Sequence, residues 1–295
     1  MKTQKKGSLF ELVLPSNWKN VTINTILKDH WQAPKKLVHS MRMENDIKVN
    51  GEMIPWNQPL SPGDTVQIHL FKNVDYDVPP TYGEIEVLFE DDHLIVVNKP
   101  AGVDTHPNHP DDTNTLANFI AFHHQMNGES CRVLHIHRLD RDTSGAIIFA
   151  KHPLSKAILD RLLSDRKIKR MYAALVHGRV KQKKGTIAEP IGRDRHHNTR
   201  RRVSQSGQEA ITHYKKIENK KDNTLLEIQL DTGRTHQIRV HMSSIGYPLV
   251  GDILYGGKPD CARQALHAKN VSFPHPLTEE AITCEAKCED LPFLS

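Results

Sequence analysis

Beyond residue 84 the chain alternates strand-length apolar segments with amphipathic helical ones, and this alternation most restricts its possible folds. The longest apolar runs, at 94–98 and 146–150, have the length of strands and fall far short of a membrane span. Neighbouring strands at 208–217 and 224–230 form a hairpin pattern, which implies antiparallel pairing. We therefore predict an α+β domain built on a mixed, largely antiparallel sheet.

The first 72 residues form a separate pattern. Two segments with helical apolar spacing precede an Asn50-Gly51 turn and an alternating strand. This order resembles the ribosomal S-four type RNA-binding domain, in a degenerate form whose helices carry few basic residues. A Pro79-Pro80 stretch follows with the composition of a linker. We predict a small α+β domain at 1–72, a linker at 73–83 and a larger domain at 84–295.

The positive charge is concentrated in one stretch. The whole chain has 40 basic and 35 acidic side chains, a net charge of +5, whereas residues 161–202 alone hold 14 basic and 3 acidic ones. A solvated basic face would explain such a stretch without function. Three basic clusters within about forty residues instead favour a polyanionic partner, most simply nucleic acid.

The sequence carries no signal for export, disulfides or cofactors. Four cysteines are too few for a disulfide framework, and the Cys284/Cys288 pair lacks a second pair to complete a tetrahedral zinc site. There is no glycine-rich phosphate loop and no dinucleotide fingerprint, so we expect neither a nucleotide cofactor nor a metal. The basic N-terminus reaches no apolar stretch of the signal-peptide type. We expect an unexported, cytoplasmic monomer that binds no membrane.

The segment HIHRLDRDTSG at 135–145 gathers the most reactive side chains. We expect a strand that runs into a tight turn. Asp142 to Gly145 are ordinary turn formers. Arg138 and Asp140 are two residues apart, so on a strand they share one face and can pair.

Six blocks in a fixed order extend this pattern along the chain. They are VNKPAG (97–102), HRLDRDTSG (137–145), KRMYAALV (169–176), TGRTHQIRVH (232–241), YPLVGDILYG (247–256) and RQALHAKNVSFPHP (263–276). Together they resemble the RluA-type pseudouridine synthases over residues 84–277. Two features depart from that family: Asp104 interrupts the apolar residues after NKPAG, and no Thr-Gly-Glu follows Pro276.

The resemblance implies an isomerase that converts uridine to pseudouridine in structured RNA, ribosomal or transfer, without a cofactor. It implies Asp140 as the catalytic residue, with Tyr172 and Arg239 beside it. Arg138 would hold a flipped-out nucleotide, and the resemblance places His137 and Thr143 next to it. The basic stretch adds Arg200, Arg201 and Arg202 as phosphate contacts.

The chemistry requires these residue types. The N-glycosidic bond must break, and the uracil must rotate and rejoin through carbon 5. A carboxylate can attack the anomeric carbon, add to carbon 6 of the base or remove a ribose proton, and the sequence leaves all three routes open. Each needs an ionised Asp140, for which Arg239 offers a counter-charge. Tyr172 offers a stacking face and a hydroxyl.

Two other interpretations remain. Nineteen histidines, with His135, His137, His236 and His241 among the motifs, suggest a zinc metallohydrolase, although their spacing matches no familiar zinc signature. The second is an RNA-binding module that has lost catalysis.

Overall fold

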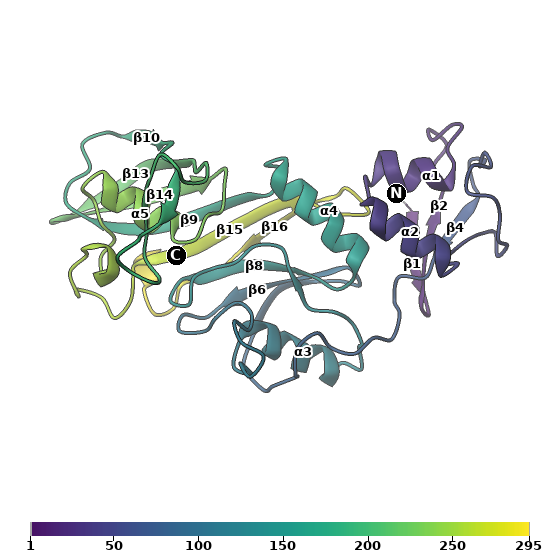
Figure 1. The fold of residues 1–295 in the computed structure, drawn as a ribbon, viewed down its shortest axis with the longest axis horizontal. Helices are drawn as coiled ribbons and strands as arrows, with labels where there is room; N and C mark the ends of the chain where they lie inside the picture. Colours follow the sequence, from purple (N-terminus) through teal and green to yellow (C-terminus); the bar gives the residue numbers. More distant parts are fainter. Residues whose placement is uncertain (1, 295) are drawn as a thin grey trace.

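The computed structural model describes residues 2–294, which form a small N-terminal sheet at one end of the molecule and a large sheet across the rest (Figure 1). Within this range every helix is too short or too polar to cross a membrane. The division into domains at 1–72 and 84–295 with a linker between them stays a prediction.

The small sheet has four antiparallel strands in the order β1-β2-β4-β3. Thr22 begins the first helical segment by accepting a hydrogen bond from the Thr25 N–H at 3.1 Å. The apolar faces of the helices pack on the sheet in a shared core. The elements are β1 (Lys2–Lys6), β2 (Leu9–Val13), α1 (Ile23–Thr25), the π-helical η1 (Ile26–His30), α2 (Lys35–Met43), β3 (Ile47–Val49) and β4 (Thr65–Ile68).

Two features of this sheet differ from the prediction. No element is predicted for the β1–β2 hairpin, because Lys2–Lys6 is polar throughout and its strand is fixed only by pairing with β2. The predicted turn is present, with Asn50 at φ 51° and Gly51 at φ 88°. However, it closes only a single bridge between Val49 and Glu52, and β3 pairs instead with the more distant β4.

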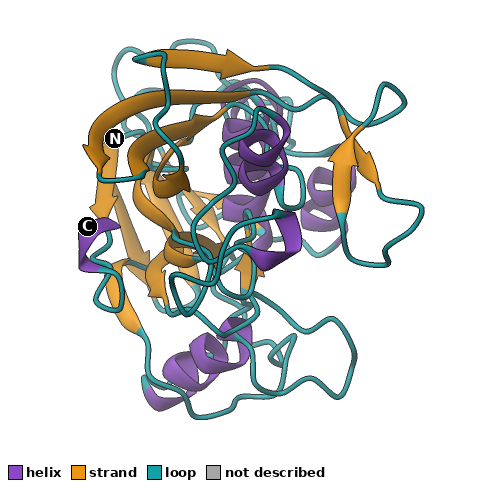
Figure 2. Cartoon of the chain, turned by 90° about the vertical axis from the view of Figure 1, so that its left-hand side faces the viewer, coloured by secondary structure: helices purple, strands orange, loops and turns teal. Residues whose placement is uncertain are grey.

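The large sheet confirms the predicted mixed, largely antiparallel architecture. Its strands follow the order β10-β13-β14-β9-β15-β8-β6-β5, with β16 on β15 and β7 on β8, and only β15 and β8 run parallel. The strands bend and twist along their length (Figure 2). They are β5 (Glu86–Glu90), β6 (Leu94–Lys99), β7 (Leu134–His135), β8 (Ser144–Ala150), β9 (Lys169–His177), β10 (Lys184–Ile187), β13 (Thr212–Lys220), β14 (Asn223–Leu230), β15 (Leu266–Pro274) and β16 (Ala281–Glu285).

Helices cover both faces of this sheet. Ile95 and Ile147 point to the layer of α3, whereas Val96 and Ile148 point to the layer of α4, so β6 and β8 are buried on both sides (Figure 1). The remaining elements are α3 (Leu116–Met126), α4 (Pro153–Ser164), β11 (Ile191–Arg193), β12 (Arg201–Val203), α5 (Gln237–Ser244) and the 3-10 turns η2 (Ile253–Tyr255) and η3 (Pro292–Leu294).

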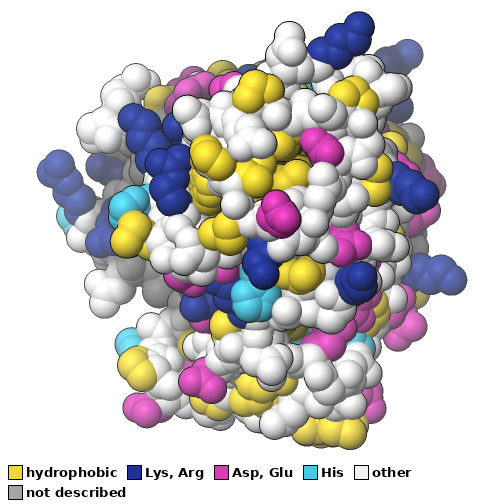
Figure 3. Space-filling model, turned by 90° about the vertical axis from the view of Figure 1, so that its right-hand side faces the viewer, with side chains coloured by type: hydrophobic (Ala, Val, Ile, Leu, Met, Phe, Trp, Pro, Cys, Tyr) yellow, Lys and Arg dark blue, Asp and Glu magenta, His cyan; other side chains and the backbone are white. Residues whose placement is uncertain are grey.

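The small N-terminal sheet and the large sheet meet through aromatic rings. His93, in the turn between β5 and β6, lies 5.3 Å from the ring of Phe10 and 5.6 Å from the ring of Phe71. An ion pair between Lys5 and Asp92, 2.7 Å long, lies at the same junction. The face of the N-terminal part that points away from the large sheet carries basic side chains interspersed with acidic and apolar ones, and no single basic patch covers it (Figure 3).

Candidate active site

Asp140 lies on a loop and not on the predicted strand. Strand β7 ends at His135. The Ile136 N–H still donates to the Ile148 carbonyl, and beyond Ile136 the chain leaves the edge of β8. A turn closed by the Thr143 N–H on the Asp140 carbonyl, at 3.0 Å, leads into β8. The predicted pairing of Arg138 with Asp140 is therefore wrong, because the two residues do not share a strand face. Arg138 is exposed and makes no ion pair with Asp140.

Arg239 is the cation that contacts Asp140. Its Nη1 donates a hydrogen bond to Asp140 Oδ2 at 3.0 Å, although the two residues are 99 positions apart. Its Nε and Nη2 bond to the two oxygens of Asp252, at 2.8 and 2.9 Å. Burial alone would lower the pKa of Arg239, but the bonds to Asp252 and the charge of Asp140 raise it above its usual value. One guanidinium thus joins the two carboxylates.

His236 and Tyr255 complete this network. His236 adopts a left-handed conformation, φ 58°, at the start of α5. Its Nδ1 is 2.8 Å from Tyr255 Oη, and its Nε2 is 3.9 Å from Asp140 Oδ2. Burial lowers the pKa of His236 despite the charge of Asp140, which favours the neutral ring at pH 7. Tyr255 and Asp252 are not among the predicted site residues, although the block YPLVGDILYG contains both.

Tyr172 and Lys99 lie beneath the loop of Asp140. Tyr172, on β9, is only 4% exposed, lines the cleft that contains Asp140, and has a pKa raised by burial. Lys99 is fully buried and donates to the carbonyls of Pro100, Val103 and Arg141 at 2.7–2.9 Å. It therefore ties the NKPAG loop to the turn that follows Asp140.

The three predicted substrate contacts near Asp140 have different environments. Arg138 is exposed at the cleft. Thr143 lines the same cleft but is buried and accepts a long hydrogen bond, 3.4 Å, from Gln264 Nε2. His137 is buried outside the cleft lining, its ring nitrogens have no hydrogen-bond partner within residues 2–294, and burial lowers its pKa to about 3. The roles of all three stay predictions.

The arginine-rich segment at 191–203, at the end of the basic stretch, forms a hairpin beside the active-site network. Strands β11 and β12 pair, and the Arg201 N–H donates to Tyr255 Oη at 2.9 Å. The Arg200 guanidinium lies 5.6 Å from the centre of the Tyr255 ring, and Arg239 lies 5.0 Å from the same ring. Arg202 is exposed on β12. Tyr255 thus links the basic hairpin to the network around Asp140.

The four histidines of the metallohydrolase interpretation do not converge. His135 stacks on His106 at 4.5 Å, His241 contacts Thr212 Oγ1 and the Glu189 carbonyl at 2.8 Å, and His236 faces Tyr255. None of the four belongs to a cluster with metal-binding geometry in the described part of the chain.

Comparisons with known proteins agree on one family for this chain. Residues 93–244 match the family model of the RNA pseudouridylate synthases, and residues 10–66 match that of the RluD ribosomal pseudouridine synthase N-terminal domain. The chain is 49% identical to an uncharacterized RNA pseudouridine synthase, YhcT, of Bacillus subtilis, over 96% of this chain and 94% of that protein. It is 37% identical to ribosomal large subunit pseudouridine synthase D of Xanthomonas campestris, over 97% and 91%. The structure of human RNA pseudouridylate synthase domain containing 1 superposes with a TM-score of 0.59 at 26% identity, covering 74% of this chain and 89% of that one.

The fold and these matches define an RNA-modifying isomerase. The chain belongs to the RNA pseudouridylate synthase family and, as predicted, to its RluA type. Enzymes of this family isomerise uridine in RNA, which excludes the metallohydrolase interpretation.

Proposed function

We propose that Asp140 carries out the isomerisation on a uridine that has been flipped out of structured RNA. The observation that supports this most is the ion pair between Asp140 and Arg239 in the cleft lined by Tyr172. The Asp140 side chain is 18% exposed, so a substrate atom can reach it while most of the carboxylate is shielded from water. An anion in such a place needs a counter-charge, and Arg239 supplies one that Asp252 holds in position.

The proposal gives each neighbour a role. Tyr172 offers its ring as a platform for the base. Arg138, exposed at the cleft, would hold the flipped-out nucleotide, with Thr143 and His137 behind it. All three routes open to Asp140 fit this arrangement.

The free-energy cost of flipping a base out of the RNA must be offset by other contacts. Turning a nucleotide out of its stack costs a few kcal/mol. Arg200, Arg201 and Arg202 lie on a hairpin that reaches the active-site network through Tyr255, so phosphate contacts there would offset the cost close to the reaction. We propose ribosomal RNA as the first target to examine, because several relatives are named ribosomal large subunit pseudouridine synthase D. Transfer RNA is the second.

The test compares Asp140→Asn with the wild type. Asparagine keeps the size and hydrogen bonding of the side chain but removes its charge, so pseudouridine formation should become undetectable while RNA binding persists. Asp160→Asn is the matched control, because Asp160 is an exposed residue on α4 that pairs with the neighbouring Lys156. The substrate would be identified by mapping pseudouridines in total RNA from a deletion strain and its parent. Near wild-type turnover by Asp140→Asn would exclude Asp140 as the catalytic residue. If the deletion strain keeps every pseudouridine of its parent, an RNA-binding module without catalytic activity is favoured.

A further inference from the structure

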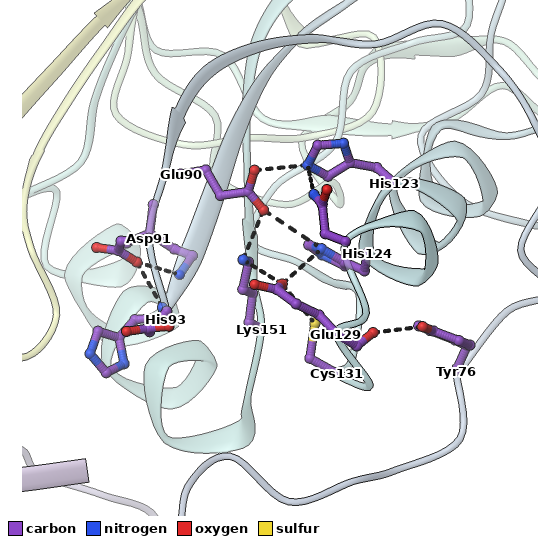
Figure 4. Close-up of polar contacts among 12 residues, drawn as sticks. Tyr76, Glu90, Asp91, His93, His123, His124, Glu129, Cys131 and Lys151 are labelled. Atoms are coloured by element: carbon purple, nitrogen blue, oxygen red, sulfur yellow. Dashed lines mark hydrogen bonds and ion pairs between the residues drawn. The ribbon is translucent and has the colours of Figure 1, made fainter. Parts of the chain in front are cut away.

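Five cationic side chains are buried in the described part of the chain, and four of them have strong partners. The five are Lys99, Lys151, Arg170, Arg239 and Arg263. Lys151 lies 2.8 Å from two carboxylates (Figure 4), and Arg239 and Arg263 each make two short bonds to an aspartate. Lys99 donates to three carbonyls. Only Arg170 lacks partners of this strength.

Arg170 is a buried cation without an anion beside it. It is 5% exposed, and within residues 2–294 its single hydrogen bond runs from Nη2 to the Thr232 carbonyl at 3.3 Å. Its Nε is buried without a partner, and its guanidinium forms no ion pair in this range. An arginine keeps its charge inside proteins, and a buried charge without a counter-ion is costly.

Arg170 faces the cleft that contains Asp140. It lies two residues before Tyr172 on β9, and both side chains line the cleft because alternate residues of a strand share a face. A side-chain carbon at Gly233 would lie only 2.9 Å from Arg170 Nη1, so the backbone there packs directly against the guanidinium. The cation is therefore held between β9 and the turn that precedes α5.

The titratable neighbours of Arg170 do not neutralise it. Burial, and then the charge of Arg170, lower the pKa of His137 to about 3, which leaves that ring neutral at pH 7. Burial raises the pKa of Tyr172 although Arg170 opposes the rise, so the hydroxyl stays protonated. Asp140 bonds to Arg239 instead. A negative charge on the substrate would supply the missing partner.

Each chemical route to pseudouridine places such a charge on the uracil ring. When the bond between C1′ and N1 breaks, its electron pair leaves with the base, and N1, O2 and O4 share the charge. When the carboxylate adds to carbon 6 instead, the electron pair of the C5–C6 double bond moves towards C4 and forms an enolate at O4. The product is neutral again, because C5 ends with one proton fewer and N1 with one more.

We propose that Arg170 donates a hydrogen bond to a carbonyl oxygen of the flipped uracil and stabilises the negative charge that forms on the ring. The inference rests on the proposed function, because the base must enter the cleft of Asp140. The depth of Arg170 suits the base, which enters furthest, whereas the exposed Arg138 lies where a phosphate can reach it. A preorganised donor of this kind contributes about 10²–10³-fold to the rate.

Arg170→Met and Arg263→Met form a matched pair for thermal unfolding without RNA. Methionine keeps the length of the side chain and removes the charge. Arg170→Met should leave the Tm unchanged or raise it, because no anion loses its partner. Arg263→Met removes bonds to Asp290 and to three carbonyls, and should lower the Tm by at least about 5 °C. A comparable fall in Arg170→Met would make Arg170 a structural residue and overturn the proposal.

Single-turnover kinetics give the second measurement. RNA from the deletion strain carries the unmodified target uridines, and pseudouridine formation is followed at saturating enzyme. Arg170→Met should lower the rate at least about a hundredfold and keep the RNA affinity within about threefold, and Arg170→Lys should recover part of the rate. A wild-type rate in Arg170→Met would overturn the proposal. So would a weaker affinity with a salt slope reduced by about 0.7–0.9, which would make Arg170 a phosphate contact.

The proposed function and this inference fail separately. An active Asp140→Asn enzyme beside a slow but stable Arg170→Met enzyme would contradict the role of Asp140 alone. An inactive Asp140→Asn enzyme beside an Arg170→Met enzyme of wild-type rate would contradict the role of Arg170 alone. The comparison of Tm values needs no activity.

Discussion

Asp252 holds the guanidinium of Arg239 through two hydrogen bonds of 2.8 and 2.9 Å, and this buried pair fixes the cation that faces Asp140. Asp252 is only 2% exposed, so it does not reach the surface where RNA would bind. Its effect on the reaction must pass through Arg239. Asp252 is thus a positioning residue.

Asp252→Asn should separate positioning from binding. The substitution leaves a buried arginine with one weaker partner, so we expect a loss of about 3 kcal/mol in unfolding free energy. The single-turnover rate should fall about 10- to 100-fold, with little change in RNA affinity. Asp290→Asn is the control, because Asp290 makes the same two-bond contact, at 2.6 and 2.9 Å, with Arg263, an arginine other than the one that bonds to Asp140. Equal losses of rate in the two variants would contradict a specific role for Asp252.

Substitution of Arg239 tests the counter-charge itself. Leucine leaves the carboxylates of Asp140 and Asp252 without their cation, so activity at neutral pH should fall by at least about a hundredfold and recover in part as pH rises. Lysine restores the charge without the forked geometry and should rescue part of the rate. Pseudouridine formation is measured across pH for both. Wild-type activity in Arg239→Leu would refute the pairing.

Much of the large sheet could be predicted, because β6, β8, β13 and β14 carry strong apolar patterns of their own. The β1 strand could not, because Lys2–Lys6 has no apolar face and its structure comes from its partner. The strand expected to lead through His135 towards Asp140 ends at His135, for a related reason. Its alternation is real, but the chain turns away from β8 after Ile136.

The candidate active site also depends on contacts between residues that are distant in the sequence. The family motifs and the need for a counter-charge lead to Asp140 and Arg239 from the sequence alone. Asp252 follows a glycine and resembles an ordinary turn residue, so only the folded chain shows that it is buried against Arg239.

The junction between the two parts should weaken in acid. His93 contacts His152 at 2.9 Å and is surrounded by His275, Asp91, Asp92 and Lys5. Burial lowers the pKa of His93 to about 4, from 6.5, so between these values the unfolded chain binds more protons than the folded one. The stability that His93 contributes is therefore complete above about pH 6.5 and declines as pH falls towards 4, by about 2 kcal/mol between pH 8 and pH 5.

Urea unfolding at pH 8 and pH 5 checks this expectation. Nearby carboxylates and histidines also titrate, so the comparison is with His93→Gln, which stays neutral but can still bond to His152. The wild type should lose about 2 kcal/mol more than the variant over this interval. Equal losses would show that His93 is not the sensitive group.

The last prediction concerns the basic hairpin, where charge and family resemblance make separate claims. If the hairpin contacts RNA phosphates, replacing Arg200, Arg201 and Arg202 with glutamine should reduce the salt dependence of binding. Each lost phosphate contact should lower the magnitude of the slope of log affinity against log salt by about 0.7–0.9. The single-turnover rate at saturating RNA should stay near the wild-type value, because the hydrogen bond from the hairpin to Tyr255 comes from the backbone N–H of Arg201, which substitution keeps, and the only side chain lost against the Tyr255 ring is the exposed Arg200. A matched variant, Lys181, Lys183 and Lys184 to glutamine, removes the same charge beside and on β10. If both variants lower the slope equally, the effect is general electrostatics; if neither does, RNA is held elsewhere, and the small N-terminal sheet becomes the next surface to test.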